Sequence, residues 1–452
     1  MERRKFIRIG TLGALGGTLM NASTANAVPM KEGTVQEEAR NIPIADRYDV
    51  VVSGAGPAGW SAAIEAGRNG AKTLLLEVNG QLGGVWTSGL LSWILDQANK
   101  PGLMRELISR LDQLDARCPI DTGNSLAFDV EKMKLLLETM CLEANVDVLL
   151  HSRVVAAIKD KSKRLTHVVT ESKSGRQAWQ GKIFIDTTGD GDLAALSGCG
   201  YDFGNPDDGG SHQPMSLLAV VSGIQFEEIE KFVRRADDKG SISKKYLLEE
   251  IVKSGVLPSY LKPGLYPIDK DLYMLMANQE YEFSGFSVKD VTKATLHARR
   301  ELHEIINGLK SLQGPWSNIR IVQTADQIGV REARRIHGLY TVTQDDLVNG
   351  ARHKDAVCRV TFGVDVHSVK EVKDPNASYN HGIRSKPYDI PLRALIAKDV
   401  GGLLMAGRCI SGDFIAHSSY RVTGNAAAMG EAAGRVAAIA ALKNKLPQEV
   451  SI

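Results

Sequence analysis

Apolar runs alternate with segments of helical periodicity through the first third of the chain. Short buried strands are expected at 48–53, 73–76 and 145–151, and amphipathic helices at 57–69, 102–114 and 128–143. Residues 152–185 instead alternate between apolar and polar positions, which predicts a three-stranded β-meander over 153–159, 165–171 and 177–185. Strands that alternate with helices predict an α/β fold with a parallel sheet.

The pattern changes after residue 201. Residues 202–386 carry scattered helices and short strands, and the longest helical signal is 288–312, where Ser287 can cap the helix. From 387 onward an apolar strand near 403–407 and a helix of small residues at 425–442 resume the first pattern. We therefore predict a discontinuous Rossmann-like domain, formed by 48–201 and 387–445, with an inserted α+β substrate domain at 202–386.

Three glycines follow the first strand in the order Gly54, Gly56 and Gly59, and Glu77 closes the second strand. In a dinucleotide site the first glycine permits a tight turn, the second lets the backbone approach a pyrophosphate, and the third lets the helix pack closely on its strand. An acidic residue about 20 positions later holds a ribose hydroxyl. An ordinary βαβ turn is the alternative reading, which the strand and helix on either side disfavour.

The first 27 residues are set apart from the fold. Arg3 and Arg4 open a basic segment, a short apolar stretch follows, and Ala25-Asn26-Ala27 offers a cleavage site. This pattern predicts a twin-arginine signal that uses the corresponding export machinery and places the protein in the periplasm or otherwise outside the cytoplasm. A frayed basic terminus is the alternative. The apolar stretch is too short for a stable membrane anchor, and residues 28–47 are expected to form a linker.

Charge and cysteine content narrow the function classes. Residues 1–27 carry four basic residues and one acid, so their removal takes the formal charge from +2 to −1. Such a chain lacks the basic field that nucleic acid requires. The five cysteines show neither C-x-x-C nor C-x-x-H spacing, which argues against a metal site and against a disulfide scaffold.

Two more glycine-rich turns follow apolar strands, at 183–192 and at 403–413. Each alone could be a routine junction, but with the first motif they point to a flavin. Their motifs are D-x-T-G-D-G-D (186–192) and A-G-R-C-I-S (406–411), and a G-G-x-x-T loop spans 83–87. From about residue 48 to 440 the chain resembles FAD-dependent oxidoreductases of the glutathione-reductase-like, two-dinucleotide-binding superfamily, and among these a bacterial group related to fumarate reductase flavoproteins.

The resemblance implies tightly bound FAD. The start of the N-terminal helix shows no His-x-x-x-His pattern that would suggest covalent flavin linkage, so we expect the FAD to be bound non-covalently. It places one group of residues at the pyrophosphate and the adenosine ribose, namely Gly54, Gly56, Ala58, Gly59 and Glu77. It places a second group along the flavin side of the phosphates and at the adenine, namely Gly83, Gly84, Thr87, Val155 (or Val154), Thr188, Gly189 and Asp190. The third group follows the ribityl chain and the flavin edge, namely Gly407, Arg408, Asp413 as hydroxyl acceptor, and Asn425 at the start of the last helix.

The candidates for catalysis are His417, Arg421 and Arg331. His417 can exchange a proton near neutral pH, and Arg421 can bind a carboxylate or an oxyanion in a bidentate contact. A lone histidine is as often structural. Arg331, Arg334 and Arg335 lie at helical spacing with Glu332, which for two of the three arginines predicts a solvated, salt-bridged helix face.

The expected function is an exported FAD-dependent oxidoreductase that transfers hydride between FAD and a small hydroxylated or carboxylated substrate. The electron acceptor, whether quinone, carrier protein or O₂, stays open. A fumarate-reductase-like alkene (enoate) reductase is one alternative, and a catalytically silent flavin-binding protein is another. Glu77 disfavours NADP, because an acid there repels a 2′-phosphate, and a plain NAD dehydrogenase leaves the second and third glycine turns unexplained.

Overall fold

The computed structural model describes residues 35, 37, 39–118, 120, 125–238, 241–368, 370–371, 374 and 379–451. The predicted export signal lies outside these residues. The chain divides into two units, Met1–Asn41 and Ile42–Ile452. In the first unit, the described residues include an ion pair between Arg40 and Glu37. The described helices and strands all belong to the second unit.

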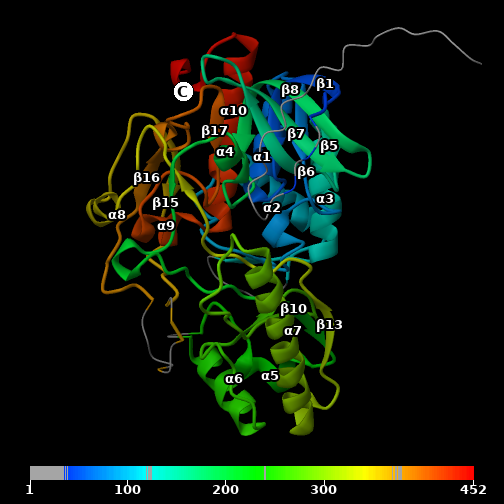
Figure 1. Cartoon of the computed structure of the whole chain (residues 1–452). Coiled ribbons are helices and arrows are strands. Elements are labelled where there is room, and N and C mark those ends of the chain that lie inside the picture. Colours follow the sequence, from blue (N-terminus) through cyan, green and yellow to red (C-terminus); the bar gives the residue numbers. More distant parts are fainter. Residues whose placement is uncertain are drawn as a thin grey trace, which may run out of the picture. The chain divides into compact units, whose positions relative to one another are not determined.

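The larger sheet has seven strands in the order β5-β2-β1-β8-β7-β6, with β17 beside β8 (Figure 1). β5, β2, β1, β8 and β17 pair in parallel, whereas β6, β7 and β8 form an antiparallel meander. The bounds are β1 (Ile44–Ser53), β2 (Thr73–Leu76), β5 (Val146–Leu149), β6 (Arg153–Lys159), β7 (Leu165–Ser172), β8 (Gly175–Asp186) and β17 (Leu403–Met405). The prediction of an α/β fold with a parallel sheet and a β-meander is confirmed.

The first strand begins earlier than its apolar residues indicate. Ile44 already pairs with Ala178 of β8, inside the stretch expected to be linker. The first half of β8 lies outside the part of the sheet where β2 and β17 also pair. Residues 44–48 can therefore pair with it although they carry no apolar pattern. Arg47 shows this, because its Nε donates to Gln180 Oε1 at 2.6 Å while its side chain stays exposed.

Helices cover the larger sheet. The predicted helices at 57–69, 102–114, 128–143 and 425–442 are found as α1 (Pro57–Arg68), α2 (Leu103–Gln113), α3 (Val130–Glu143) and α10 (Thr423–Leu442). Asp129 caps α3 by accepting from the backbone N–H groups of Glu131 and Lys132. A shorter helix, α4 (Asp192–Leu196), follows β8.

α1 and α10 approach each other at backbone distance (Figure 1). A Cβ on Gly430 would lie 2.0 Å from the carbonyl oxygen of Ala58, and one on Gly434 would lie 2.2 Å from that of Ala62. The small residues of α1 therefore serve contact with α10 as well as with the sheet. Ser61 ties the two helices together, because its Oγ lies 2.8 Å from the carbonyl oxygen of Ala427.

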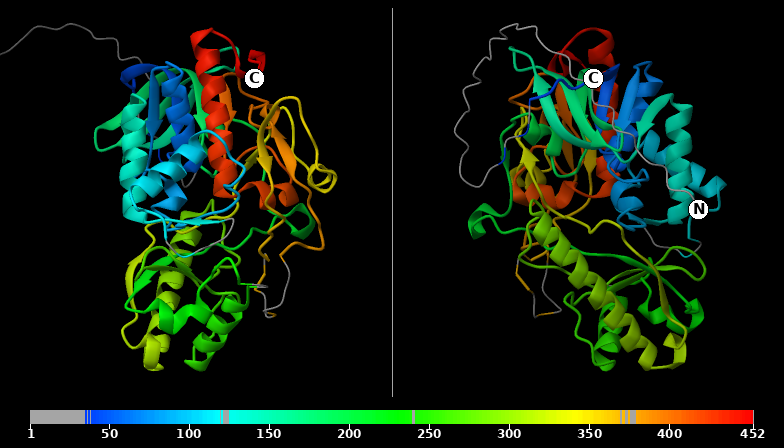
Figure 2. Two further views of the ribbon diagram at one scale, coloured as in Figure 1. Left: turned by 180° about the vertical axis from the view of Figure 1, so that it is seen from behind. Right: turned by 45° about the vertical axis from the view of Figure 1, so that its right-hand side comes forward.

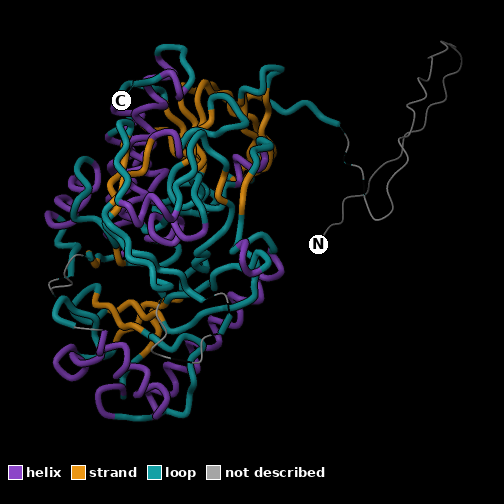
Figure 3. The backbone as a smooth tube through the Cα atoms, turned by 90° about the vertical axis from the view of Figure 1, so that its left-hand side faces the viewer, coloured by secondary structure: helices purple, strands orange, loops and turns teal. Residues whose placement is uncertain are grey.

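A second group of strands lies apart from the first (Figure 3). It is an antiparallel sheet in the order β11-β12-β10-β13. Long helices accompany it (Figure 2), and the predicted cap of the longest is confirmed, because Ser287 accepts from the backbone N–H of Asp290. The bounds are β10 (Ala219–Ser222), β11 (Gly264–Pro267), β12 (Tyr273–Met276), β13 (Arg320–Thr324), α5 (Phe226–Ile229), α6 (Ile242–Lys253) and α7 (Val288–Ser311).

The later part of the expected insert returns to the larger sheet. Ile336 donates its N–H to the carbonyl oxygen of Cys409 at 2.9 Å. The elements of this part are β14 (Arg335–Ile336), which pairs with β9 (Tyr201–Asp202), α8 (Gln344–Asn349) and β15 (Ala356–Val360). β15 pairs with β16 (Tyr388–Pro391), which lies after the expected insert, as does α9 (Phe414–Tyr420). No helix in the described part of the chain combines the length and the hydropathy needed to cross a bilayer.

We predict that Gly430→Ala lowers the free energy of unfolding by about 2 kcal/mol or more, because a methyl group 2.0 Å from the Ala58 carbonyl must push α10 off α1. Urea unfolding of the purified variant measures this. Gly363→Ala is the matched control, because its new methyl would meet only Ser385 Oγ at 3.8 Å. Equal loss of stability in both variants would contradict the proposed helix contact.

Candidate active site with two adjoining cavities

The carboxyl ends of four parallel strands meet at one cavity of about 570 Å³, which we call the first cavity. The loops after β1, β2, β8 and β17 line it with residues 54, 56–58, 76–79, 187–190 and 406–408. Its other side is closed by Gly285, Phe286, Val288, Val291, Thr295, Asp326, Gln327, Ile328, Val330 and Arg334. Ligands of open α/β sheets bind in this position, outside the carboxyl ends of the strands.

The three glycines of the first motif do different things. Gly54 has φ +96, and a Cβ there would lie 2.6 Å from the carbonyl oxygen of Thr187. A Cβ on Gly59 would lie 1.7 Å from the carbonyl oxygen of Gly54, so this glycine serves helix packing. A Cβ on Gly56 would meet nothing within 4 Å. Gly56 is therefore the position that keeps the cavity open to a ligand.

Glu77 joins the ends of the first two strands. Its Oε2 accepts from the backbone N–H of Ala55 at 2.7 Å, and its Oε1 accepts from that of Asn79 at 2.9 Å. The residue is 5% exposed and lines the first cavity. Oε1 also accepts from Asn79 Nδ2 at 2.9 Å, whereas Oε2 can accept a further hydrogen bond, so Glu77 fits the predicted contact with a ribose hydroxyl.

Two helices begin at the first cavity. Pro57 and Ala58 of α1 line it, and so do Thr423 and Ala426 of α10. The N-terminal ends of both helices carry partial positive charge and unpaired N–H groups, which favour anions such as phosphate. Thr423 Oγ1 is buried and has no hydrogen-bond partner in the described structure, as expected for a group that awaits a ligand.

Charged side chains border the first cavity beside β8. Arg408 NH2 lies 2.5 Å from Asp190 Oδ1, and Arg334 NH1 lies 2.8 Å from Asp192 Oδ1. Asp186 holds the turn between them by accepting from the N–H groups of Thr188 and Ala194. Burial raises the pKa of Asp186 to about 6. The acidic motif therefore has two roles: Asp186 holds the turn, and Asp190 and Asp192 line the first cavity.

The predicted cofactor residues fall into two sets. Those that line the first cavity are Gly54, Gly56, Ala58, Glu77, Gly84, Thr188, Gly189, Asp190, Gly407 and Arg408. Those that the structure places behind its lining are Gly59, Gly83, Thr87, Val155, Asp413 and Asn425. Val154 lines the cavity in place of Val155, since successive residues of a strand face opposite sides.

Three residues of the second set have structural roles. Gly83 donates its N–H to the carbonyl oxygen of Ala55 at 2.8 Å. Thr87 Oγ1 donates to the carbonyl oxygen of Leu82. Asn425 is 0% exposed at the base of α10. They support the cavity from behind.

Asp413 and His417 depart from the roles expected of them. Asp413 caps α9 by accepting from Ala416 N at 2.7 Å, and it also accepts from Gln344 N at 2.6 Å, so it lines neither cavity. His417 is 0% exposed, and burial lowers its pKa well below the usual value. The segment folds into α9 and turns the ring inward, where direct proton transfer to a substrate is not available to it.

A second cavity of about 1040 Å³ adjoins the first. The residues that line both cavities are Val85, Val330, Arg408, Arg421 and Thr423. Two predicted catalytic residues therefore lie at the second cavity, since Arg331 lines it as well. A ligand of the first cavity and a ligand of the second can meet across this shared wall.

The predicted helix face of arginines is wrong. Residues 327–334 form no helix, and Arg335 belongs to β14. Arg335 is 3% exposed and forms an ion pair with Glu332 at 2.5 Å. Arg331 NH1 donates to the carbonyl oxygen of Pro214 at 2.6 Å and to Ser216 Oγ at 3.0 Å. Charges at helical spacing indicated a solvated helix. Glu332 does pair with Arg335, but Arg331 bonds Pro214, 117 residues away, and Arg334 bonds Asp192, 142 residues away, so the arginines form no solvated helix face.

Arg421 is held in a buried polar network. Its NH2 donates to the carbonyl oxygen of Asp365 at 2.8 Å, while its buried Nε has no partner in the described structure. Burial lowers the pKa of Arg421 to about 10 and also lowers that of Arg331. Both guanidinium groups stay protonated at neutral pH and lack full solvation, so each favours an anionic ligand.

His367 and Asp365 are site residues that were not selected from the sequence. They line the second cavity, and His367 Nε2 lies 3.4 Å from Asp365 Oδ2. Gln279 Nε2 lies 2.5 Å from His367 Nδ1. Burial lowers the pKa of His367 to about 4, to which Arg331 also contributes. The D-x-H spacing was their only signal, because alternate residues of an extended segment share a face.

Asp365 balances part of the positive charge. Burial alone would raise its pKa, but His367, Arg421 and Arg331 together hold the pKa well below its usual range. The carboxylate is therefore ionised at neutral pH. With His367 neutral, two arginines face one acid, and this part of the second cavity stays net positive.

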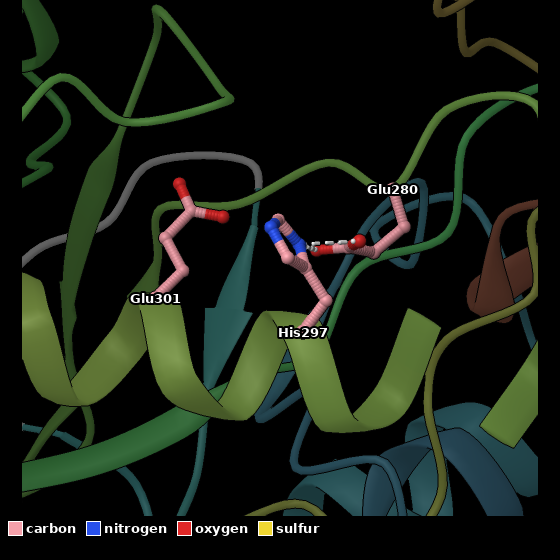
Figure 4. A group of neighbouring side chains, drawn as sticks. All are labelled: Glu280, His297 and Glu301. Carbon is pink, nitrogen blue, oxygen red and sulfur yellow. Dashed lines mark hydrogen bonds and ion pairs between the residues drawn. The ribbon is translucent and has the colours of Figure 1, made fainter. Parts of the chain in front are cut away.

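Glu280, His297 and Glu301 form a cluster behind the wall of the second cavity (Figure 4). The imidazole lies between the carboxylates; its Nδ1 is 2.9 Å from Glu280 Oε2. Glu301 accepts from Ser259 N at 2.6 Å, and Ser259 Oγ in turn accepts from Gln279 N at 2.9 Å. Burial raises the pKa of Glu280 to about 7. These residue types can bind metals, but here protein groups already bond both carboxylates. The cluster connects α7 to Glu280, which follows Gln279, the residue that contacts His367.

We predict that acid destabilises the protein through His367. Its pKa in the fold is about 4, below the usual value of about 6.5. As pH falls from about 6.5 to about 4 the unfolded chain gains a proton that the folded chain does not, so folding loses up to roughly 3 kcal/mol. Urea unfolding should show a flatter pH dependence for His367→Gln. His303→Gln, on the exposed face of α7, should follow the wild type; the same slope in all three would contradict the assignment.

Comparison with solved structures finds proteins of modest similarity. They include a geranylgeranyl bacteriochlorophyll reductase-like protein from Thermoplasma acidophilum, with 13% identity, a TM-score of 0.49, and coverage of 88% of this chain and 80% of that one. They also include the flavin-dependent brominase Bmp2, with 13% identity, a TM-score of 0.45 and the same coverage. At these scores the similarity assigns no reaction.

A family comparison is decisive where single structures are not. The profile described as FAD dependent oxidoreductase matches residues 49–452, which is most of the chain and includes every residue that lines the two cavities. The cofactor that this family uses is FAD, and the protein is an FAD-dependent enzyme. The chain belongs to the family of FAD-dependent oxidoreductases.

Proposed function

We propose that the mature protein is an exported oxidoreductase that transfers hydride between FAD, held non-covalently in the first cavity, and a carboxylate-bearing organic substrate in the second. The observation that carries the substrate assignment is the pair of arginines, Arg331 and Arg421, whose guanidinium groups are largely buried at a cavity that shares a wall with the first. The sequence left hydroxylated and carboxylated substrates open, and the positive charge of these two arginines favours the carboxylated ones.

The residues of the first cavity fit FAD. The open position at Gly56 and the N-terminal ends of α1 and α10 suit a pyrophosphate, and the Glu77 carboxylate suits a ribose. Thr423 and Arg408, on the shared wall, would hold the end of the cofactor that faces the substrate. Bound FAD supplies the hydride chemistry, so the protein has to orient the substrate, tune its charge and exclude water.

Arg331 and Arg421 would bind and orient the substrate carboxylate. Each presents a planar set of N–H donors that matches two carboxylate oxygens. Arg331 is anchored by Pro214 and Ser216, and Arg421 by Asp365, so neither has to be ordered when the substrate binds. Because both are buried, their attraction for an anion is weakly screened by solvent.

His367 would hold or accept the proton that a hydroxyl group loses on oxidation. At neutral pH the imidazole is neutral, because its pKa is lowered to about 4 by burial, with Arg331 contributing. Asp365, 3.4 Å from Nε2, would stabilise the imidazolium that forms. The contact of Gln279 with Nδ1 fixes the ring orientation.

An enoate reductase is the second candidate, and one observation favours it. Burial lowers the pKa of Arg421 to about 10, which makes its guanidinium a better proton donor than a solvated one. The flavin-binding protein without turnover is the third candidate, and it offers no reason for Arg331, His367 and Asp365 to face the same cavity.

The proposal of export rests on residues 1–27 alone. Detection of the mature, FAD-loaded chain in the periplasmic fraction would test it.

Anaerobic spectroscopy of the FAD-loaded protein tests the proposal. Hydroxy acids should bleach the flavin band, whereas the corresponding alcohols without a carboxylate should not. Reoxidation of the dithionite-reduced protein by enoates, without any bleaching by hydroxy acids, would favour the second candidate. A yellow protein that no member of either panel reduces or reoxidises would favour the third.

We predict that Arg331→Gln raises KM for the carboxylate substrate by about 10-fold to 100-fold, because a hydrogen bond to a charged group contributes roughly 1.5–3 kcal/mol. FAD content should stay unchanged, since Arg331 does not line the first cavity. Steady-state kinetics and the ratio of flavin to protein absorbance measure both effects. Arg300→Gln, on the exposed face of α7, is the control.

We also predict that Gly56→Val lowers FAD occupancy without destabilising the apo chain. Its side chain would enter the first cavity, where a Cβ meets nothing within 4 Å. Gly59→Val should instead prevent folding, because its Cβ would lie 1.7 Å from the Gly54 carbonyl oxygen. Flavin content and apo-protein melting temperature separate the two. Full FAD occupancy in Gly56→Val would contradict the assigned position of the pyrophosphate.

A further inference from the structure

We infer that the second cavity binds acids with a bulky apolar body, held by the carboxylate between Arg331 and Arg421 and by the body against a wall of aromatic and sulfur-containing side chains around Trp93 and Tyr266. This inference deepens the proposed function and rests on it for the identity of the substrate-binding cavity. It departs from the small hydroxylated or sugar-like compounds expected from the sequence.

The wall is built by the antiparallel sheet and by the loop before β3 (Trp93–Ile94). Tyr266 of β11 pairs with Met274 of β12, and Met276 shares the face of Met274 because alternate residues of a strand point the same way. All three line the second cavity. Trp93 packs edge-on to Tyr266, with ring centroids 4.8 Å apart at 62°. The result is a continuous apolar surface rather than single apolar residues.

More apolar side chains extend this surface. They come from the chain after the G-G-x-x-T loop (83–87), from α6 and from positions next to other elements, namely Leu91, Leu95, Leu218, Leu248, Phe362 and Val422. A polar substrate would lose its hydration against such a wall without recovering hydrogen bonds. An apolar body gains free energy there in proportion to the area it buries.

The size of the cavity argues in the same direction. Its volume of about 1040 Å³ lies at the upper end of the roughly 300–1,000 Å³ range typical of small-molecule sites. A four-carbon dicarboxylate would leave most of this space to water. The charged groups also lie together, with Arg331, Asp365, His367 and Arg421 joined in one network. A ligand with one acidic end and one large apolar end matches both features.

Basic residues on the remaining side explain how such an acid would enter. Lys244 and Lys245 of α6 line the second cavity together with Lys262, whose ammonium lies 4.6 Å from the Tyr379 ring centroid. One acidic side chain, that of Glu249, lines this side as well, and its Oε1 lies 3.9 Å from Lys245 Nζ. A positive opening raises the rate at which anions arrive, and the aliphatic stems of the lysines add apolar contact.

Isothermal titration of the FAD-loaded protein tests the inference with four probes: butyrate, 4-phenylbutyrate, 4-phenylbutan-1-ol and succinate. We expect 4-phenylbutyrate to bind at least 10-fold more tightly than butyrate, and more tightly than the alcohol or succinate. Trp93→Ala should reduce the preference for the phenyl group and leave butyrate affinity unchanged. Arg331→Gln should weaken both acids and leave the alcohol unchanged.

Other results would overturn the inference. Tighter binding of succinate than of 4-phenylbutyrate, equal binding of butyrate and 4-phenylbutyrate, or no binding of any probe would each do so. Its failure can be told apart from failure of the proposed function. Flavin bleaching by small hydroxy acids without a phenyl preference would remove only the inference, whereas tight binding of apolar acids that never exchange electrons with the flavin would remove only the proposed reaction.

Discussion

The site depends on the direct backbone contact between α1 and α10. Gly430 and Gly434 let α10 approach until its backbone touches the carbonyl groups of Ala58 and Ala62. Because both helices begin at the first cavity, this contact fixes the spacing of two positive helix ends around one anion site. Side chains any larger would separate the two ends, so the small-residue composition of α10 is a requirement of cofactor binding as well as of packing.

A polar network performs the same task for the second cavity. Gln213 accepts from His367 N at 3.1 Å, and its side-chain amide lies 3.5 Å from Glu332, which pairs with Arg335. Arg421 joins the network through Asp365. Buried charges are stable only when bonded on several sides, and this bonding holds Arg421 rigidly on the wall that the cavities share. One connected group of residues thus sets the position of Arg421, which lines both cavities.

The sequence predicted the features that depend on local pattern. The glycine turns, the meander and the long helix with its Ser287 cap were confirmed, because each arises from spacing within a short segment. It failed where a polar side chain has a distant partner. Arg335 was expected to be solvated because the neighbouring Glu332 was its only visible partner, whereas the Gly412 carbonyl oxygen that also bonds it lies 77 residues away. His367 could not be selected, because its partner Gln279 lies 88 residues away.

The order of the cavity residues along the chain has a consequence for biosynthesis. The lining of the first cavity starts at Gly54 and ends at Ala426, and the glycines that seat α10 come later still. A nascent chain on the ribosome therefore has no complete first cavity until α10 has been translated. With FAD in the first cavity, as proposed, bound flavin reports that a chain has been made through α10 and folded, and fragments that stop before α10 should be colourless.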